Sequence, residues 1–409
     1  MTAQFHRLVV ETVEPITSDA VRVVFAVPEP LREAYRYAAG QHLTIDFTNS
    51  RIVDELGLGP DAAAQGSRGS AAAPAKASSR AAAKLRRFYS LCEAPPLDGP
   101  PDHLAIAVKR QGPGGIADYM VSKLAPGEQL DVLTPAGGFH ATPEVGHTGP
   151  DRITGIAAGS GITPILAIIQ DALRKNPAVS AALIYGNRTG AEIMFEDEIV
   201  RLAGRYRGRF EVLHVLSRED QGIPMLHGRI DREKLPWLLT AVGAGPGDAY
   251  YLCGPFGMVE DARAVLAGMN AEHVRFELYV ASAEAKSAAA AEAVNAGGGT
   301  VDMADTSAWH AAAAENPITP VVVRLGGRTT YCELRPEDPS LLDAVLRERP
   351  EVPFACADGV CGTCRARLAA GSVTMARDYG LEPGEKRSGY ILTCQALPTS
   401  AEVALDFDT

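Results

Sequence analysis

Four of the seven cysteines lie close together near the carboxyl end of the chain, and their spacing constrains the fold more than any other feature. They follow the pattern Cys356-x4-Cys361-x2-Cys364-x29-Cys394. Three of these thiols share one short loop, CADGVCGTC, whose small residues let the backbone wrap closely around a metal centre. The C-x4-C-x2-C…C arrangement is typical of [2Fe–2S] ligation. We therefore predict that all four cysteines are ligands of one iron–sulfur cluster.

Zinc coordination and inert thiols are the alternative interpretations of these cysteines. Zinc sites usually combine paired C-x2-C segments. Here only Cys361 and Cys364 form such a pair, while Cys394 stands alone. The remaining cysteines are scattered along the chain: Cys92, Cys253 and Cys332.

Charge and hydropathy exclude some classes of partner. The chain has no apolar run of the ~18 residues that suggest a membrane span. Its first residues, MTAQFHRLVVETVEP, lack a basic region followed by an apolar core. We therefore expect no membrane association and a cytoplasmic location, where clustered thiols indicate metal binding rather than disulfides. The formal net charge of −11 argues against nucleic acid as a partner, because phosphate repels an acidic protein.

The first domain is expected over residues 1–150, since a chain of 409 residues is too long for one core. Short apolar segments separated by turn residues predict an antiparallel β-barrel. The stretch 49–84 is rich in alanine, glycine and serine, and we interpret it as an inserted loop. The expected strands are 7–15, 20–27, 41–47, 86–91, 103–109 and 129–133, with one helix over 116–125.

A second domain is expected over residues 151–280, where strands and helices alternate. Such alternation predicts an α/β fold, a parallel sheet with helices on both faces. The expected strands are 151–158, 181–186, 210–217 and 248–254, and the expected helices are 164–175, 191–205 and 256–268.

Residues 281–317 and 318–409 complete the chain. The first segment includes AEAKSAAAAEAVNAGGGT and is interpreted as a flexible linker. The second begins with a hairpin over 318–334 and a helix over 340–348, followed by the cysteine loop and expected strands at 372–375, 390–394 and 401–407. The segment PSLLDAVLRERPEVPFACADGVCGTCRARLAAGSV resembles plant-type ferredoxin domains. That resemblance implies an α+β β-grasp ferredoxin domain.

One strand of the barrel carries the tetrapeptide Arg87-Phe88-Tyr89-Ser90. It fits the R-x-Y-S pattern of the ferredoxin–NADP reductase superfamily, which the chain resembles here. An arginine can neutralise a flavin phosphate, a tyrosine ring can cover the isoalloxazine, and a serine hydroxyl can hydrogen-bond flavin N5. An ordinary barrel strand is the alternative, because such a tetrapeptide arises readily by chance.

A second segment, VKRQGPGGIADYM, resembles the superfamily's other flavin-binding segment. Its expected contacts are Val108, Lys109, Gly114, Gly115 and Ile116. The glycines open a helix whose amino end can receive a pyrophosphate, which favours FAD over FMN. Asp118 departs from the pattern, because relatives often carry serine or threonine there. Its carboxylate would repel phosphate unless it points away or caps the helix.

A glycine-rich turn follows the first strand of the second domain. The segment GIAAGSGITP ends one strand and opens a helix, and its glycines permit close approach of a pyrophosphate. Together with YLCGP it resembles the nicotinamide site of the same superfamily. The expected contacts are Gly159, Ser160, Gly161, Thr163, Pro164, Cys253, Gly254 and Pro255. A buried strand thiol is the alternative interpretation of Cys253.

The nucleotide is expected to be NADPH rather than NADH. Ser217 and Arg218 follow the third strand, where related NADPH enzymes bind the 2′-phosphate, and Arg188 in YGNR could assist. An acidic residue at that strand end would instead favour NADH, and Glu219 and Asp220 lie slightly further on.

Three residues are expected to act on the hydride: Ser90, Cys253 and Glu277. Glu277, in RFELY, resembles a position where relatives place an acid near the flavin, and a surface strand residue is the alternative. Since no Ser/His/Asp triad and no paired carboxylates stand out, hydrolytic chemistry is not expected.

The chain resembles the reductase components of phenylacetyl-CoA epoxidases in the order of its modules and in the segments YGNRT…IMFEDEI, HVLSRE and HGRID. That resemblance implies an oxidoreductase that takes a hydride from NAD(P)H and passes single electrons through [2Fe–2S] to a di-iron or Rieske oxygenase. We expect the linker to let the ferredoxin domain move between flavin and partner. Reductases of 3-ketosteroid 9α-hydroxylases or aromatic-ring hydroxylases, and a stand-alone flavin or ferredoxin reductase, remain alternatives.

Overall fold

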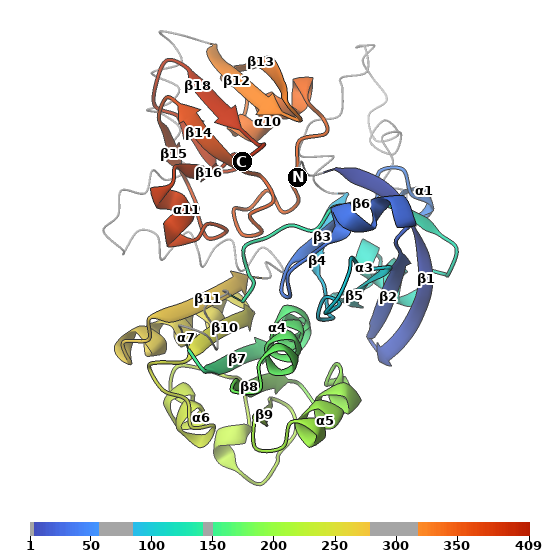
Figure 1. The fold of residues 1–409 in the computed structure, drawn as a ribbon, viewed down its shortest axis with the longest axis vertical. Coiled ribbons are helices and arrows are strands. Elements are labelled where there is room, and N and C mark those ends of the chain that lie inside the picture. Colours follow the sequence, from blue (N-terminus) through green and yellow to red (C-terminus); the bar gives the residue numbers. More distant parts are fainter. Residues whose placement is uncertain (1–3, 57–84, 142–149, 279–317) are drawn as a thin grey trace.

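Three β-sheets follow one another along the chain in the computed structural model, which describes residues 4–56, 85–141, 150–278 and 318–409 (Figure 1). The first sheet is antiparallel, the second parallel and the third mixed. This sequence of folds confirms the expected fold class. The predicted linker 281–317 lies outside the described residues, and the domain boundaries stay predictions.

The first sheet has the strand order β4-β3-β6-β1-β2-β5. Its strands are β1 (Phe5–Thr17), β2 (Ala20–Ala26), β3 (His42–Asp46), β4 (Arg86–Ser90), β5 (His103–Lys109) and β6 (Gln129–Leu133). A bridge between Leu91 and Ile106 joins the two outermost strands and closes the sheet into a barrel. Alternate side chains, such as Val21, Val23 and Phe25 on β2, fill its interior.

Three short helical elements accompany the barrel: η1 (Glu29–Tyr35), α1 (Arg51–Glu55) and α3 (Ile116–Ser122). The start of the stretch predicted to be an inserted loop is therefore helical. Ile52 and Val53 are almost fully buried, and this apolar pair anchors α1 to the barrel core. Residues 57–84 of that stretch lie outside the described residues.

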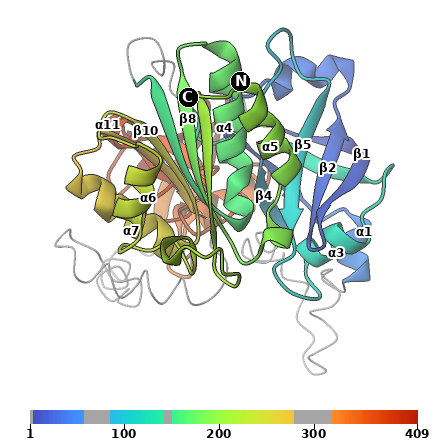
Figure 2. The same cartoon turned by 90° about the horizontal axis from the view of Figure 1, so that it is seen from below.

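The second sheet has the order β11-β10-β7-β8-β9, and all its neighbouring strands are parallel. Its strands are β7 (Arg152–Ala158), β8 (Ser180–Asn187), β9 (Phe210–Leu216), β10 (Ala249–Gly254) and β11 (His273–Leu278). One face is covered by α4 (Ile162–Lys175) and α5 (Glu196–Arg205), the other by α6 (Leu235–Ala241) and α7 (Phe256–Gly268) (Figure 2). The strand order reverses between β7 and β10, and ligands of such sheets bind at that point.

One predicted helix is wrong at its start. The helix expected over 191–205 begins only at Glu196, and its first part is a short 3-10 turn, η3 (Gly190–Glu192), followed by extended backbone. Phe195 has a left-handed φ of 61°, which ends any continuous helix through it. The acidic run of Glu196, Asp197 and Glu198 then favours a new helix start, because carboxylates stabilise the amino end of the helix dipole.

The third sheet has the order β13-β12-β18-β14-β16, beside a two-stranded ribbon of β15 and β17. Its elements are β12 (Thr319–Leu325), β13 (Arg328–Leu334), α10 (Leu341–Glu348), β14 (Arg365–Ala370), β15 (Val373–Met375), α11 (Pro383–Arg387), β16 (Tyr390–Leu392), β17 (Ala396–Pro398) and β18 (Val403–Asp406). Helix α10 packs across this sheet, as in a β-grasp. The long segment between α10 and β14 carries the cysteine loop.

The third domain sits across the junction of the other two (Figure 1). Val360 from the cysteine loop packs within the apolar cluster of the second domain, and Phe256 contacts Tyr379 edge to face. On the barrel side, the Arg86 guanidinium lies 4.2 Å from the Phe354 ring centroid. The cysteine loop is thereby held against both neighbouring domains. Among the described helices, none is long and apolar enough to cross a membrane.

Candidate functional site

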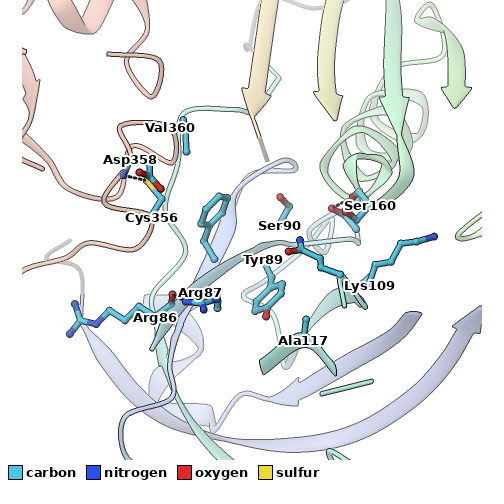
Figure 3. A pocket seen from close by; sticks show the side chains of 14 residues that line it. Arg86, Arg87, Tyr89, Ser90, Lys109, Ala117, Ser160, Cys356, Asp358 and Val360 are labelled. Carbon is cyan, nitrogen blue, oxygen red and sulfur yellow. Dashed lines mark hydrogen bonds between the residues drawn. The ribbon is translucent and has the colours of Figure 1, made fainter. Parts of the chain in front are cut away.

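A cavity of about 340 Å³ opens where the three domains meet (Figure 3). It is lined by several of the predicted site residues: Arg87, Phe88, Tyr89, Ser90, Lys109, Ser160, Thr163 and Cys356. The barrel, the amino end of α4 and the cysteine loop each supply one wall. The structure therefore brings together residues that are nearly 270 positions apart in the sequence.

Strand β4 delivers the tetrapeptide to this cavity. It pairs with β3, with Ser90 opposite His42 and Tyr89 opposite Leu43. Along β4, Arg87 is exposed, Phe88 and Tyr89 are partly buried, and Ser90 is buried. An arginine at the open end and a buried hydroxyl at the closed end suit a ligand with an anionic tail and a planar polar head.

Ser90 forms a buried hydrogen bond across the domain boundary. Its hydroxyl donates to Glu277 Oε2 at 3.0 Å, and Glu277 is only 5% exposed. The alternative interpretation of Glu277 as a surface residue is therefore wrong. Burial raises the pKa of the Glu277 carboxyl to about 7, although the Ser90 hydrogen bond opposes this shift. A carboxyl group of that kind can hold or release a proton near neutral pH.

The predicted second flavin segment surrounds the start of α3. Gly114 has a φ of 78°, and its N–H donates to the Asp118 carboxylate at 2.8 Å. Arg110 pairs with the same carboxylate at 2.8 Å. Asp118 therefore caps its own loop and is neutralised there, which removes much of the expected repulsion towards a phosphate. Val108 and Ile116 are buried in the barrel core.

Lys109 and Arg188 meet across the boundary of the first two domains. Lys109 Nζ lies 3.4 Å from Asp19, and the Arg188 guanidinium lies 3.1 Å from the same aspartate. Arg188 also pairs with Glu192. These ion pairs join the barrel to the parallel sheet, and Arg188 is drawn towards carboxylates rather than held in an open position.

The glycine-rich turn and the end of β10 pack tightly against each other. A Cβ atom on Gly161 would lie 2.1 Å from the Cys253 carbonyl oxygen, and one on Gly254 would lie 2.6 Å from Met258. Gly159 has a left-handed φ of 54°. Only glycines permit this approach, so the glycine-rich turn and the end of β10 meet at the strand-order reversal. Around them, Thr163 donates to the Ser160 carbonyl at 3.0 Å, Pro164 lies in the first turn of α4, and Pro255 precedes α7.

The end of β9 carries the residues expected to select the nucleotide. Ser217 is half-buried, and its N–H donates to the Asn187 carbonyl at 2.9 Å. Arg218 is exposed beside it. The Glu219 carboxylate is turned away to the Gly190 N–H, at 2.8 Å.

The four clustered cysteines are arranged as two pairs. Cys356 lies within hydrogen-bonding reach of Cys361, and Cys364 within reach of Cys394. Within the described ranges, no three His, Cys, Asp or Glu side chains converge as they would around a single ion. A two-iron cluster needs two thiolates on each iron, whereas structural zinc needs four ligands around one point. The donor set therefore fits [2Fe–2S] better than zinc.

Backbone N–H groups point at the sulfurs, as expected from the loop sequence. The N–H of Asp358 donates to Cys356 Sγ at 3.4 Å, and the N–H of Thr363 donates to Cys361 Sγ at 3.5 Å. The Cys361 thiol, helped by backbone N–H groups, lowers the pKa of Cys356 to about 6. Such donors stabilise negative charge on a metal-bound sulfur.

Left-handed backbone makes this wrapping possible. Ala357, Gly359 and Gly362 have φ values of 55°, 78° and 69°. A Cβ on Gly362 would also lie 2.9 Å from the Gly380 carbonyl oxygen. Small residues in the loop are therefore a steric requirement.

Sequence reasoning missed two residues that hold the domains together, Arg86 and His42. Arg86 pairs with Asp46 at 2.7 Å and donates to the Val352 carbonyl at 3.3 Å. His42 Nε2 lies 3.0 Å from Thr363 Oγ1 of the cysteine loop. A lone histidine or arginine in a barrel strand gives no sequence signal for a partner in another domain.

Comparisons with known proteins identify two of the domains. Residues 156–264 match the oxidoreductase NAD-binding domain, and residues 323–399 match the 2Fe-2S iron-sulfur cluster binding domain. The chain is 35% identical to one of the subunits of the Escherichia coli 1,2-phenylacetyl-CoA epoxidase, over 99% of this chain and 98% of that protein. It is 29% identical to the ferredoxin reductase component of 3-ketosteroid-9-alpha-monooxygenase from Rhodococcus rhodochrous, over 98% of this chain and 96% of that protein.

Solved structures share the fold. Phthalate dioxygenase reductase superposes with a TM-score of 0.51 at 22% identity, covering 98% of both chains. An intact type IV self-sufficient cytochrome P450 monooxygenase gives 0.61 at 19% identity, covering 98% of this chain and 41% of that one.

The fold, the cavity and the paired cysteines define an NAD(P)H-dependent oxidoreductase that uses a flavin and a [2Fe–2S] cluster. Sequence similarity over nearly the whole chain narrows this class. The chain belongs to the family of oxygenase reductases that includes its relative in the 1,2-phenylacetyl-CoA epoxidase.

Proposed function

We propose that this chain is the reductase component of a phenylacetyl-CoA epoxidase, taking a hydride from NADPH and delivering single electrons to the oxygenase. The observation that carries the proposal is the cavity at which the barrel, the glycine-rich turn and the cysteine loop meet. A bound flavin supplies the conversion of a two-electron hydride into single electrons. The protein supplies position, charge and the exclusion of water.

The barrel residues are assigned to the flavin. Arg87, at the exposed end of β4, would neutralise a phosphate, and Tyr89 would cover one face of the ring system. Ser90 would present its hydroxyl to N5, with Glu277 behind it as a proton reservoir. Phe88 lines the same cavity. Val108, Lys109, Gly114, Gly115 and Ile116 would border the dinucleotide, so we assign FAD rather than FMN, which chromatography of the released flavin tests.

The nicotinamide is assigned to the crevice between β7 and β10. Gly159, Ser160 and Gly161 would receive the pyrophosphate together with Thr163 and Pro164 at the start of α4. Cys253, Gly254 and Pro255 lie beside this turn. Cys253 would therefore border the nicotinamide ring.

Replacing Arg218 by alanine should raise the KM for NADPH by about 10-fold, because the loss of one charge-assisted hydrogen bond to the 2′-phosphate has about that effect. The KM for NADH should stay within about twofold, since NADH lacks that phosphate. Steady-state kinetics with both nucleotides make the measurement. Ser217→Ala should also raise the KM for NADPH. Arg207→Ala, also on a charged surface but before β9, is the matched control. An equal loss for both nucleotides would contradict the assignment of NADPH.

Electron delivery to a partner is expected to need separation of the third domain. The cysteine loop lines the cavity with Cys356, Asp358 and Val360, and its Cys361 and Thr363 are buried. An oxygenase approaching from that side would meet the barrel and the parallel sheet instead. This supports the expectation that the ferredoxin domain alternates between flavin and partner.

A cross-link in the docked arrangement should stop turnover with the oxygenase but not internal electron transfer. Arg275 and Glu382 pair at 3.1 Å across the domain boundary, and Arg275→Cys with Glu382→Cys would accept a short bismaleimide there. Cluster reduction by NADPH should survive, while oxygenase reduction should fall at least ~10-fold. Each single cysteine variant treated with the same reagent is the control. Full oxygenase reduction in the cross-linked protein would mean that separation is not required.

The partner assignment has a second candidate. Ferredoxin reductase components of 3-ketosteroid-9-alpha-monooxygenases are 29–31% identical over 96–98% of this chain. The test is reconstitution of the holoprotein with the oxygenase of each system, with substrate oxidation per NADPH consumed as the readout. Coupled oxidation of phenylacetyl-CoA supports the proposal, whereas coupling only with the steroid system favours the second candidate.

An anaerobic titration tests the electron chain itself. Purified protein is reduced with NADPH and then with NADH, while iron and sulfide are assayed. Bleaching of flavin and cluster absorbance together supports the proposed function. The absence of both chromophores after reconstitution would overturn it.

A further inference from the structure

A line of polar contacts starts at the edge of the cavity and joins side chains of all three domains. It starts at Ser90, whose hydroxyl donates to Glu277 Oε2 at 3.0 Å. Glu277 Oε1 lies 3.7 Å from His42 Nδ1, and His42 Nε2 lies 3.0 Å from Thr363 Oγ1. The N–H of Thr363 then donates to Cys361 Sγ at 3.5 Å. Side chains from all three domains therefore lie in one row.

His42 occupies the centre of this row and is completely buried. Its ring stacks at a tilt against Phe88, with 5.4 Å between centroids, and a Cβ on Gly137 would lie 2.7 Å from its Nδ1. Gly137 has a φ of 105°, so glycine there leaves room for the ring. The imidazole is thereby fixed by packing on two sides and has little freedom to turn.

Burial also fixes the charge of the ring. Desolvation lowers the pKa of His42 to about 4, so the imidazole is neutral under ordinary conditions. A neutral imidazole carries one N–H and one acceptor nitrogen. Within the described residues, Nδ1 has no hydrogen-bond partner, although Glu277 is close. Among the described residues, the hydrogen bond that the His42 imidazole makes is therefore the bond to Thr363.

The bond from His42 to Thr363 connects the barrel to the cysteine loop at a buried position. The Arg86 guanidinium makes a second buried contact, to the Val352 carbonyl, whereas the pair of Arg275 and Glu382 is only partly buried. A buried polar group that loses its partner is costly. His42 therefore favours the arrangement in which Thr363 is in place, and disfavours displaced arrangements of the loop.

We propose that His42 is a positioning residue. Through its hydrogen bond to Thr363, His42 holds the cysteine loop in register with the Ser90–Glu277 pair, and this contact docks the ferredoxin domain for electron transfer. This rests on the proposed function. In the step concerned, one electron leaves the reduced flavin and enters the oxidised cluster. No bond forms or breaks, and no proton needs to pass between the domains.

The test is Thr363→Val, compared with Thr363→Ser in the full-length holoprotein. Valine keeps the shape of threonine but removes the hydroxyl, whereas serine keeps the hydroxyl. Both variants leave Ser90, Glu277 and His42 unchanged. In anaerobic stopped-flow with NADPH, Thr363→Val should slow cluster reduction by about 10-fold, the effect of a buried hydrogen bond with an orphaned partner. Flavin reduction should stay within about twofold, and Thr363→Ser should restore cluster reduction.

Hydrogen exchange gives a readout that does not depend on turnover. Thr363→Val and His42→Phe should both speed amide exchange in peptides covering β3 and the cysteine loop, because the docked arrangement is populated less. The double variant should show no further increase, since both changes remove the same bond. Iron content and cluster absorbance, measured in parallel, show whether the cluster itself is intact.

The outcomes separate this inference from the proposed function. Wild-type rates of cluster reduction and wild-type exchange in Thr363→Val, with the cluster intact, would overturn the role of His42. Additive effects in the double variant would also overturn it. If the unmodified protein fails to reduce its cluster with NADPH at all, the proposed function fails instead.

Discussion

Replacing Cys361 by serine should abolish electron delivery to the oxygenase while flavin reduction by NADPH continues. Cys361 is buried, pairs with Cys356 and accepts the Thr363 N–H. An alkoxide is a poorer iron ligand than a thiolate, and a [2Fe–2S] centre needs all four positions. We expect loss of most iron and sulfide and a fall in oxygenase reduction of at least ~100-fold, because no other one-electron carrier in the chain replaces the cluster.

The measurement pairs two activities of one preparation. Reduction of ferricyanide, which accepts electrons directly from flavin, should remain within about twofold of the original protein, whereas oxygenase-coupled turnover disappears. Cys332→Ser is the matched control, because Cys332 is a buried thiol of β13 outside the cysteine loop. If Cys361→Ser kept its iron and its coupled turnover, the assignment of the four ligands would be wrong.

The second large effect is expected for Glu277→Gln. Glutamine keeps the size of the side chain and can still contact Ser90, but it cannot hold or release a proton. If Glu277 acts as a proton reservoir behind Ser90, flavin reduction by NADPH should fall by about 100-fold. Ser90→Ala should cause a loss of similar size, and the double variant should be little worse than either single change, since the two residues act together. Stopped-flow flavin reduction, with flavin content as the control, makes the measurement.

Glu277→Gln should slow flavin reduction but raise the unfolding free energy of the protein. Because burial raises the pKa of Glu277 from 4.5 in the unfolded chain to about 7, the folded protein resists ionisation of this group. The resulting penalty is absent at low pH, grows between these two values and is complete above about pH 7. Glutamine removes this penalty. The unfolding free energy of Glu277→Gln, relative to that of the original protein, should therefore increase by about 2 kcal/mol as the pH rises from about 5 to about 8. A constant difference across this range would show that Glu277 titrates normally.

Periodicity was sufficient to predict the antiparallel and the parallel sheet, whereas the β-grasp of the third domain was expected from its resemblance to plant-type ferredoxin domains. On β2 of the barrel, fully buried residues alternate with partly buried ones, whereas β7 and β10 of the parallel sheet carry continuous runs of buried residues, so these strands leave different patterns. The cysteine spacing predicted the ligand set, because three thiols on one loop leave few alternatives. The contact between the glycine-rich turn and the end of β10 depends on the order of the strands in the sheet, which the sequence pattern did not predict. The role of each site residue stays a prediction.

Local sequence patterns could not predict the contacts between domains. His42 and Arg86 lie in strands that would look the same without a partner, and their contacts with Thr363 and Val352 depend on how the domains pack. The start of α5 was misjudged because the left-handed φ of Phe195 depends on tertiary packing rather than on its own preference. Arg188 matched a nucleotide pattern, yet two carboxylates from different segments surround it.

The wall that the third domain contributes to the cavity has a consequence for side reactions. Cys356, Asp358 and Val360 close one side of the space beside Tyr89 and Ser90 (Figure 3). If the flavin ring lies in this cavity as proposed, these residues would limit the access of dioxygen to it while they are in place, and a ferredoxin domain that moves to its partner would take that shield with it. Peroxide formed per NADPH consumed should therefore rise with the time that the ferredoxin domain spends away. The coupling efficiency of the whole oxygenase would then be set partly by how quickly this wall returns.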